Sequence, residues 1–269
     1  MTIKIVSPEN DAELGTSDPW RDLTSLTDAR IALGRVGASM PTTEVLRLSF
    51  AHAKARDAVH ADLDMAALTP ALETLQLETV EVRSAAGDRM TYLRRPDYGR
   101  RVSPQDVERL SELDFEGVKV SIVIADGLSA TAVQANTIPF LSALLPLLRG
   151  IGANIGPAVV VKNGRVAIGD EIGHRQGADI VLVLIGERPG LSAADSLGLY
   201  ITYAPRVGRS DAERNCISNI RAGGLVPGVA AKKAFWLISE ALSRKLTGVD
   251  LKDSDAVLTL PEFSQRLAD

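Results

Sequence analysis

Three polar clusters in this 269-residue sequence follow apolar runs that are typical of buried strands. Residues 126–129 read Asp-Gly-Leu-Ser, residues 186–190 read Gly-Glu-Arg-Pro-Gly, and residues 204–206 read Ala-Pro-Arg. Ligands of open α/β sheets bind beyond the carboxyl ends of the strands, so parallel strands would bring all three clusters to one ligand-binding rim. Each cluster taken alone could instead be ordinary turn chemistry, since Asp-Gly and Pro-Gly are frequent in turns.

The sequence lacks the motifs of an autonomous catalyst. It has no GxxxxGK[ST] phosphate loop and no HExxH metal motif, and its three histidines are scattered. The glycines at positions 150, 152 and 156 have the wrong spacing for a dinucleotide fingerprint, and a helix end followed by a turn explains them better. Cys216 is the single cysteine, so an intrachain disulfide and a cysteine-ligated metal cluster are excluded. We therefore predict no autonomous catalytic constellation and no metal site in this chain.

Strands and helices are expected to alternate in the part of the chain that carries the clusters. The sequence predicts strands at residues 118–124, 158–162, 180–185 and 199–203, and helices at residues 103–113, 131–148, 170–176 and 229–247. Nearly continuous apolar strands are typical of sheets that are buried on both faces. This pattern predicts an α/β fold with a Rossmann-like, mostly parallel sheet flanked by helices over residues 103–269.

The first hundred residues have a different character. Residues 1–20 are polar and rich in turn formers, which predicts a flexible N-terminal segment. Residues 21–102 are expected to form a smaller, mainly helical lobe. Within this lobe we predict helices over residues 28–33 and from residue 41 onward, and a short strand at residues 78–83.

Composition narrows the classes of partner. The net charge is -4 with 24% charged residues, which is not the basic excess of a nucleic-acid-binding protein. No uncharged apolar stretch reaches the roughly 20 residues that span a bilayer, and the longest apolar run, residues 138–148, contains two prolines. A secretory signal is also missing, and one cysteine fits a reducing compartment. These features predict a cytoplasmic protein that binds neither nucleic acid nor membrane.

Seven stretches, read together, closely resemble the small (light) chain of ethanolamine ammonia-lyase. Their order and spacing hold from about residue 22 to about residue 245, and they cover residues 28–35, 50–60, 92–101, 124–130, 164–170, 186–191 and 214–220. The resemblance implies an enzyme that uses adenosylcobalamin and radical chemistry to convert ethanolamine to acetaldehyde and ammonia. It also implies a hetero-oligomer in which the large subunit binds ethanolamine and carries the catalytic residues, while the cobalamin lies between the two chains.

The resemblance implies three cobalamin contacts in this sequence, at Val166, Glu187 and Cys216. The corrin rim carries amide side chains, so a carboxylate acceptor such as Glu187 suits it chemically. Glu187 could instead pair with a nearby arginine such as Arg188 or Arg206, and Val166 could be an ordinary core residue. Cys216 would pack as a small, soft group, in keeping with the usual behaviour of a lone cysteine as a small buried hydrophobe.

Two family features are not matched. Residues 174–177 read His-Arg-Gln-Gly and resemble the tail of the DxHxxG signature of one class of cobalamin proteins, but Ile172 stands where the aspartate should be. We therefore expect no histidine of this chain to replace the lower ligand of the cofactor. Some small subunits enter a bacterial microcompartment through a longer N-terminal extension, and residues 1–20 do not resemble such an amphipathic helix.

Two other functions stay open on the sequence alone. One is a stand-alone α/β enzyme with a small-molecule site at the same rim, although the missing nucleotide, metal and triad motifs weigh against it. The other is a purely structural subunit that is needed for assembly and touches no cofactor.

Overall fold

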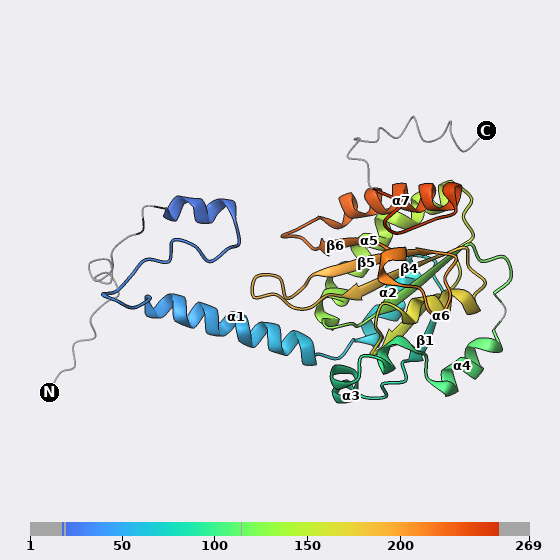
Figure 1. Cartoon of the computed structure of the whole chain (residues 1–269), viewed down its shortest axis with the longest axis horizontal. Helices are drawn as coiled ribbons and strands as arrows, with labels where there is room; N and C mark the ends of the chain where they lie inside the picture. Colours follow the sequence, from blue (N-terminus) through green and yellow to red (C-terminus); the bar gives the residue numbers. More distant parts are fainter. Residues whose placement is uncertain (1–17, 19, 114, 253–269) are drawn as a thin grey trace. The chain divides into compact units, whose positions relative to one another are not determined.

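The computed structural model describes residue 18 and residues 20–113 and 115–252. Its contacts divide the chain into two compact units (Figure 1). Unit 1 contains the residues up to Asp57 together with residues 190–192, and unit 2 contains residues 58–189 and the residues from Ala193 onward. The predicted N-terminal segment, residues 1–20, lies outside the described residues except for Asp18 and Trp20.

Unit 2 is built on one six-stranded sheet with the strand order β1-β3-β2-β4-β5-β6. The first four strands in this order are parallel to one another, whereas β5 is antiparallel to β4 and β6 is antiparallel to β5. The α/β prediction is confirmed, and the sheet is mixed rather than purely parallel. The strands are β1 (Thr79–Arg83), β2 (Val120–Ala125), β3 (Ala158–Lys162), β4 (Ile180–Gly186), β5 (Leu197–Tyr203) and β6 (Asn215–Ile220).

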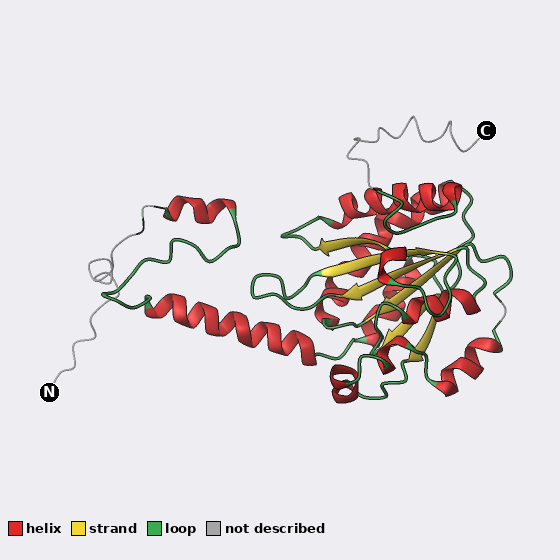
Figure 2. Cartoon of the chain, in the orientation of Figure 1, coloured by secondary structure: helices red, strands yellow, loops and turns green. Residues whose placement is uncertain are grey.

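Helices cover both faces of this sheet (Figure 2). On one face α5 (Ala130–Gly150) packs against α7 (Pro227–Arg244), with α2 (Met65–Thr74) beside it. The other face is covered by α4 (Pro104–Ser111) and α6 (Ile168–Arg175). Because side chains of a strand alternate between faces, Ile122 and Ile124 join the first core and Val123 the second.

Capping residues explain where several of these helices begin. Ser103 accepts a hydrogen bond from the Asp106 N–H at 3.2 Å and precedes Pro104 at the start of α4. Ser129 caps α5 by accepting from the Ala132 N–H at 3.1 Å. By length and composition α5 could cross a membrane, but half of its apolar window is buried, and it packs on the sheet beside α7 as a core helix.

The N-terminal part differs from its predicted structure in one respect. The helix expected at residues 28–33 is wrong, because only residues 21–26 form a 3₁₀ turn and Ala32 adopts a φ of 52°, which a right-handed helix excludes. The helix predicted from residue 41 is confirmed as α1 (Thr42–His60). The strand predicted within the helical lobe is β1, which pairs with β3 at the edge of the sheet.

Candidate functional site

The prediction that three clusters share one rim is wrong for one of them. Since β5 runs antiparallel to β4, residues 204–206 lie at the opposite end of the strands, beside the amino end of β4. There the Ala204 N–H donates to the Asp179 oxygen at 2.7 Å, next to the start of β4. The other two clusters do lie together at the carboxyl ends of parallel strands. Residues 126–129 follow β2, and residues 186–190 follow β4.

Two glycines let these remaining clusters touch through their backbones. The Leu128 N–H donates to the Gly186 oxygen at 2.9 Å. A Cβ atom on Gly127, which has a φ of 56°, would lie 2.2 Å from the Gly186 oxygen, and a Cβ atom on Gly186 would lie 2.1 Å from the Ser129 oxygen. No other residue fits at these positions without moving a loop, so this contact fixes the ends of β2 and β4 together.

Asp126 holds a third loop against this pair. Its carboxylate accepts hydrogen bonds from the Asn163 N–H at 3.0 Å and the Gly164 N–H at 3.2 Å, and Arg89 lies 3.6 Å away. Burial raises the pKa of Asp126, against the opposing effects of these N–H groups and of the arginine. Asp126 therefore positions the loop after β3, which carries Val166.

Tyr92 of α3 (Arg89–Arg94) forms a rigid wall beside that loop. The guanidinium groups of Arg89 and Arg165 lie 4.8 and 4.2 Å from the centre of its ring, within cation–π range. Its hydroxyl donates to the Gly164 oxygen at 3.3 Å. Burial of the ring raises the pKa of Tyr92 to about 12, so the hydroxyl stays protonated.

These elements enclose a pocket of about 410 Å³ at the carboxyl ends of β2, β3 and β4. The helices that follow β2 and β3 cover opposite faces of the sheet, which is the topology that opens a ligand crevice in α/β folds. The pocket brings together two of the three predicted site residues, Val166 and Glu187. It is lined by Tyr92, Gly127, Leu128, Arg165, Val166, Ile185, Gly186, Glu187, Arg188 and Tyr200.

Glu187 makes neither of the ion pairs that the sequence left open. Its carboxylate accepts hydrogen bonds from the Ser196 hydroxyl at 2.5 Å, the Ser218 hydroxyl at 2.5 Å and the Asn219 N–H at 3.1 Å. In the part of the chain that the structure describes, no arginine lies within ion-pair distance of it. Val166 is half-buried, and it both packs on the second core and lines the pocket.

Cys216 lies beside the pocket rather than in its wall. It is exposed on β6, so its expected character as a small buried hydrophobe is wrong. Across the β5–β6 ladder it pairs with Tyr200. Tyr200 lines the pocket, and it therefore connects Cys216 to the other two predicted residues. His174, by contrast, is exposed in α6 and does not line the pocket.

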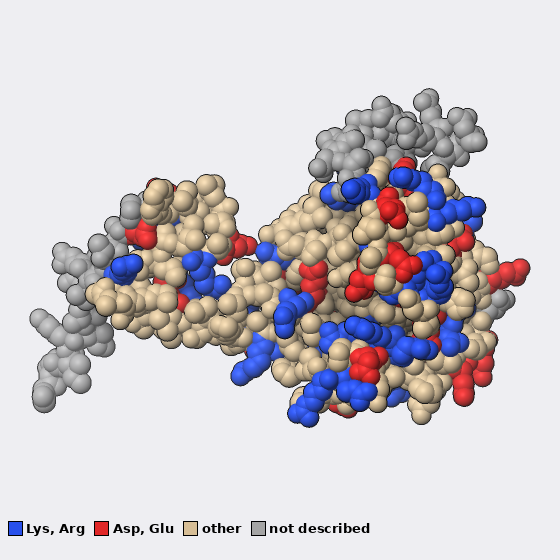
Figure 3. Space-filling view, in the orientation of Figure 1, with Lys and Arg blue, Asp and Glu red and all other residues tan. Residues whose placement is uncertain are grey.

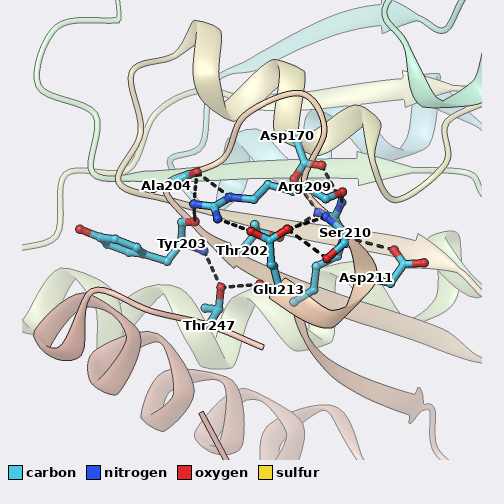
Figure 4. Close-up of polar contacts among 10 residues, drawn as sticks. Asp170, Thr202, Tyr203, Ala204, Arg209, Ser210, Asp211, Glu213 and Thr247 are labelled. Atoms are coloured by element: carbon cyan, nitrogen blue, oxygen red, sulfur yellow. Dashed lines mark hydrogen bonds and ion pairs between the residues drawn. The ribbon is translucent and has the colours of Figure 1, made fainter. Parts of the chain in front are cut away.

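The loop after β5 is held by a polar network that the sequence did not indicate (Figure 4). Arg209 donates to the Tyr203 oxygen at 3.2 Å and to the Ala204 oxygen at 2.9 Å, and it forms an ion pair with Glu213. Arg214 forms a buried ion pair with Asp170. These contacts give the third cluster a structural role as a turn.

Comparison with known proteins supplies a family for this fold and pocket. The family model of the ethanolamine ammonia-lyase light chain matches residues 17–252. The ethanolamine ammonia-lyase small subunit of Azotobacter vinelandii is 52% identical over 93% of this chain and 94% of its own length. That of Pseudomonas fluorescens is 52% identical over 90% of each chain, and that of Pseudomonas aeruginosa is 50% identical over 94% of this chain and 92% of its own.

Proposed function

Because the chain belongs to the ethanolamine ammonia-lyase light-chain family, we propose that it is the small subunit of a lyase that converts ethanolamine to acetaldehyde and ammonia. We further propose that its pocket forms one wall of the cobalamin site. The observation that carries this role is the presence of Val166 and Glu187 in one pocket. Cys216 lies next to it, paired across the β5–β6 ladder with Tyr200, which also lines the pocket. The large subunit would provide the ethanolamine site and the catalytic residues.

The residues present suit adenosylcobalamin. Glu187 lines the pocket, and its carboxylate accepts hydrogen bonds from neutral donors, which do not neutralise its charge. The carboxylate can therefore accept a further, charge-assisted hydrogen bond from an amide N–H of a corrin. Val166 offers an apolar surface beside it. A volume of about 410 Å³ is in the range of pockets for small, drug-sized ligands, so this chain would enclose only part of a corrin. When bound, the cofactor supplies a cobalt–carbon bond that breaks homolytically to start radical chemistry.

Unit 1 supports assembly with a large subunit. It exposes a set of large apolar side chains, including Leu46 and Phe50 of α1 at 64% and 65% exposure. On the face that Figure 3 shows, most of the described surface of unit 1 carries no charged residue. Exposed apolar patches of this kind mark interaction sites in soluble proteins. Among the residues of unit 1 that the structure describes, these side chains are Trp20, Leu23, Leu26, Ile31, Val36, Met40, Val45, Leu46, Phe50 and Leu191. We place the assembled enzyme in the cytoplasm.

The test is co-expression with a large subunit, followed by co-purification and titration with cobalamin by absorbance. Glu187→Ala should leave the complex intact and weaken cobalamin binding about tenfold or more, because a hydrogen bond to a charged group is lost. Glu73→Ala, which removes an exposed glutamate of α2, is the matched control. Unchanged cobalamin affinity in Glu187→Ala would favour a purely structural subunit.

The isolated chain should release no ammonia from ethanolamine. This expectation follows because the catalytic residues are proposed to lie in the large subunit. Deamination by the purified chain alone would favour a stand-alone enzyme instead.

A further inference from the structure

A β-bulge lies beside the pocket, between the last two strands of the sheet. Leu197 of β5 pairs with Ile220 of β6, and Leu199 pairs with Ile217. Gly198 on β5 therefore faces two residues of β6, which are Ser218 and Asn219. One of them, Asn219, has a φ of 58°, a conformation that asparagine tolerates better than most residues. Bulges of this kind often lie next to functional sites, where they redirect side chains.

Gly198 leaves the space in which the Glu187 side chain lies. A Cβ atom at position 198 would lie 2.9 Å from Oε1 of Glu187 and 3.1 Å from its Cγ. The Glu187 N–H donates to the Ser196 oxygen at 3.0 Å, which extends the β4–β5 hairpin past Gly186. The glutamate side chain thus crosses over the glycine and reaches the bulge on β6.

Three neutral donors fix the carboxylate once it is there. Oε2 accepts from the Ser196 hydroxyl and the Asn219 N–H, and Oε1 accepts from the Ser218 hydroxyl. A carboxylate offers about four acceptor positions, so one position is left, on Oε1. Because Glu187 also lines the pocket, that position is available to a donor on a bound ligand.

We propose that Ser196, Gly198 and Ser218 are positioning residues, which fix the Glu187 carboxylate so that the last acceptor position of Oε1 meets an amide N–H of the bound cofactor. This proposal rests on the proposed function, in which Glu187 contacts cobalamin. A preorganised acceptor loses little freedom on binding, and so it strengthens binding more than a mobile one does.

The experiment uses the co-purified complex with its large subunit and measures the KM for adenosylcobalamin and the kcat at saturating cofactor. Ser196→Ala and Ser218→Ala should each raise that KM about 3- to 10-fold, the effect of one lost hydrogen bond, with kcat within about twofold. Ser218→Thr keeps a hydroxyl and should restore the KM. The matched control is Ser142→Ala, which removes an exposed serine hydroxyl from α5.

Gly198→Ala provides a second, independent variant. It keeps every polar group but displaces the carboxylate, so it should raise the KM about as much as Glu187→Ala does, tenfold or more. Ser218 is exposed at the edge of the sheet, so Ser218→Ala tests the proposal even where Gly198→Ala does not fold.

The outcomes separate this inference from the proposed function. A raised KM in Glu187→Ala, with wild-type values in both serine variants and in Gly198→Ala, overturns the positioning role and leaves the cofactor role intact. A loss of kcat at unchanged KM also overturns it. A wild-type KM in Glu187→Ala removes the cofactor role itself.

Discussion

The ion pair between Asp170 and Arg214 is the most deeply buried charge pair that the structure describes, and it gives a sharp prediction for stability. The two side chains are 1% and 2% exposed. The guanidinium donates twice to the carboxylate, at 2.5 and 2.7 Å, and it also donates to the Thr202 hydroxyl at 3.1 Å and the Arg209 oxygen at 2.8 Å. Asp170→Ala would remove the buried counter-charge of this guanidinium and leave only the exposed Asp211 carboxylate, 3.4 Å from Nε, beside it.

The expected loss is large for a single substitution. Removing one partner of a buried ion pair costs about 3–5 kcal/mol, because the other charge stays desolvated and unpaired. For a chain of this size each kcal/mol lowers the Tm by about 2–4 °C. Asp170→Ala should therefore lower the Tm by about 6–20 °C.

Thermal unfolding of the purified chain, followed by far-UV circular dichroism, measures this shift. The matched control is Asp211→Ala, since the Asp211 carboxylate lies 3.4 Å from Nε of Arg214 but is 96% exposed. An exposed ion pair contributes about 0–1 kcal/mol, so this control should stay near the wild-type Tm. Equal shifts in the two variants would refute the reasoning, because burial would then not set the cost.

Replacing both partners gives a further check on the same reasoning. Asp170→Leu combined with Arg214→Met removes both charges and fills the space with apolar groups. The double variant should be more stable than Asp170→Ala, because no buried charge is left unpaired. A double variant that is less stable than the single one would show that packing, rather than the orphaned charge, dominates.

Three further predictions concern the pocket, the loss of thermal stability at acidic pH, and the surface of unit 1. Gly186→Ala should lower the Tm and weaken cobalamin binding because its Cβ would lie 2.1 Å from a backbone oxygen, whereas Gly150→Ala, with no atom within 4 Å, should be neutral in both assays. A backbone N–H and an arginine hold the pKa of Glu213 at about 2, so its contribution to stability is present above its ordinary value and is lost as pH falls toward 2. Glu213→Gln should flatten the decline of Tm between pH about 4.5 and 2, and an unchanged slope would contradict this. Leu46→Ser with Phe50→Ser should weaken co-purification with the large subunit, and intact complex on size-exclusion chromatography would show that this surface is not the contact.

The parallel core of the sheet could be predicted from the sequence, but the direction of β5 was misjudged. Its apolar run looks the same whether the strand is parallel or antiparallel. The informative signal was the connection before it, residues 187–196, which is short and contains no helix. A parallel partner needs a crossover of a dozen or more residues, so this length favours a hairpin.

Strand β6 was missed because its sequence does not resemble a buried strand. Asn215, Ser218 and Asn219 interrupt the apolar pattern, and the bulge breaks the alternation between faces. The edge position of this strand lets polar residues occur there. The same bulge explains why sequence reasoning did not indicate that Ser218 contacts Glu187.

Part of the candidate site could be predicted and part could not. The family resemblance identified Val166 and Glu187, and the structure brings them into one pocket. The usual behaviour of a lone cysteine predicts a buried side chain, but β6 is an edge strand and exposes Cys216. That all three contact cobalamin stays a prediction, which the Glu187 variants test.

The apolar surface of unit 1 has a consequence for how the chain is produced. Any copy made in excess of its large subunit would present Trp20, Leu26 and Phe50 to water. Uncovered surfaces of this kind favour self-association and precipitation. Balanced synthesis of the two polypeptides would therefore determine the yield of usable enzyme, both in the cell and in a recombinant host.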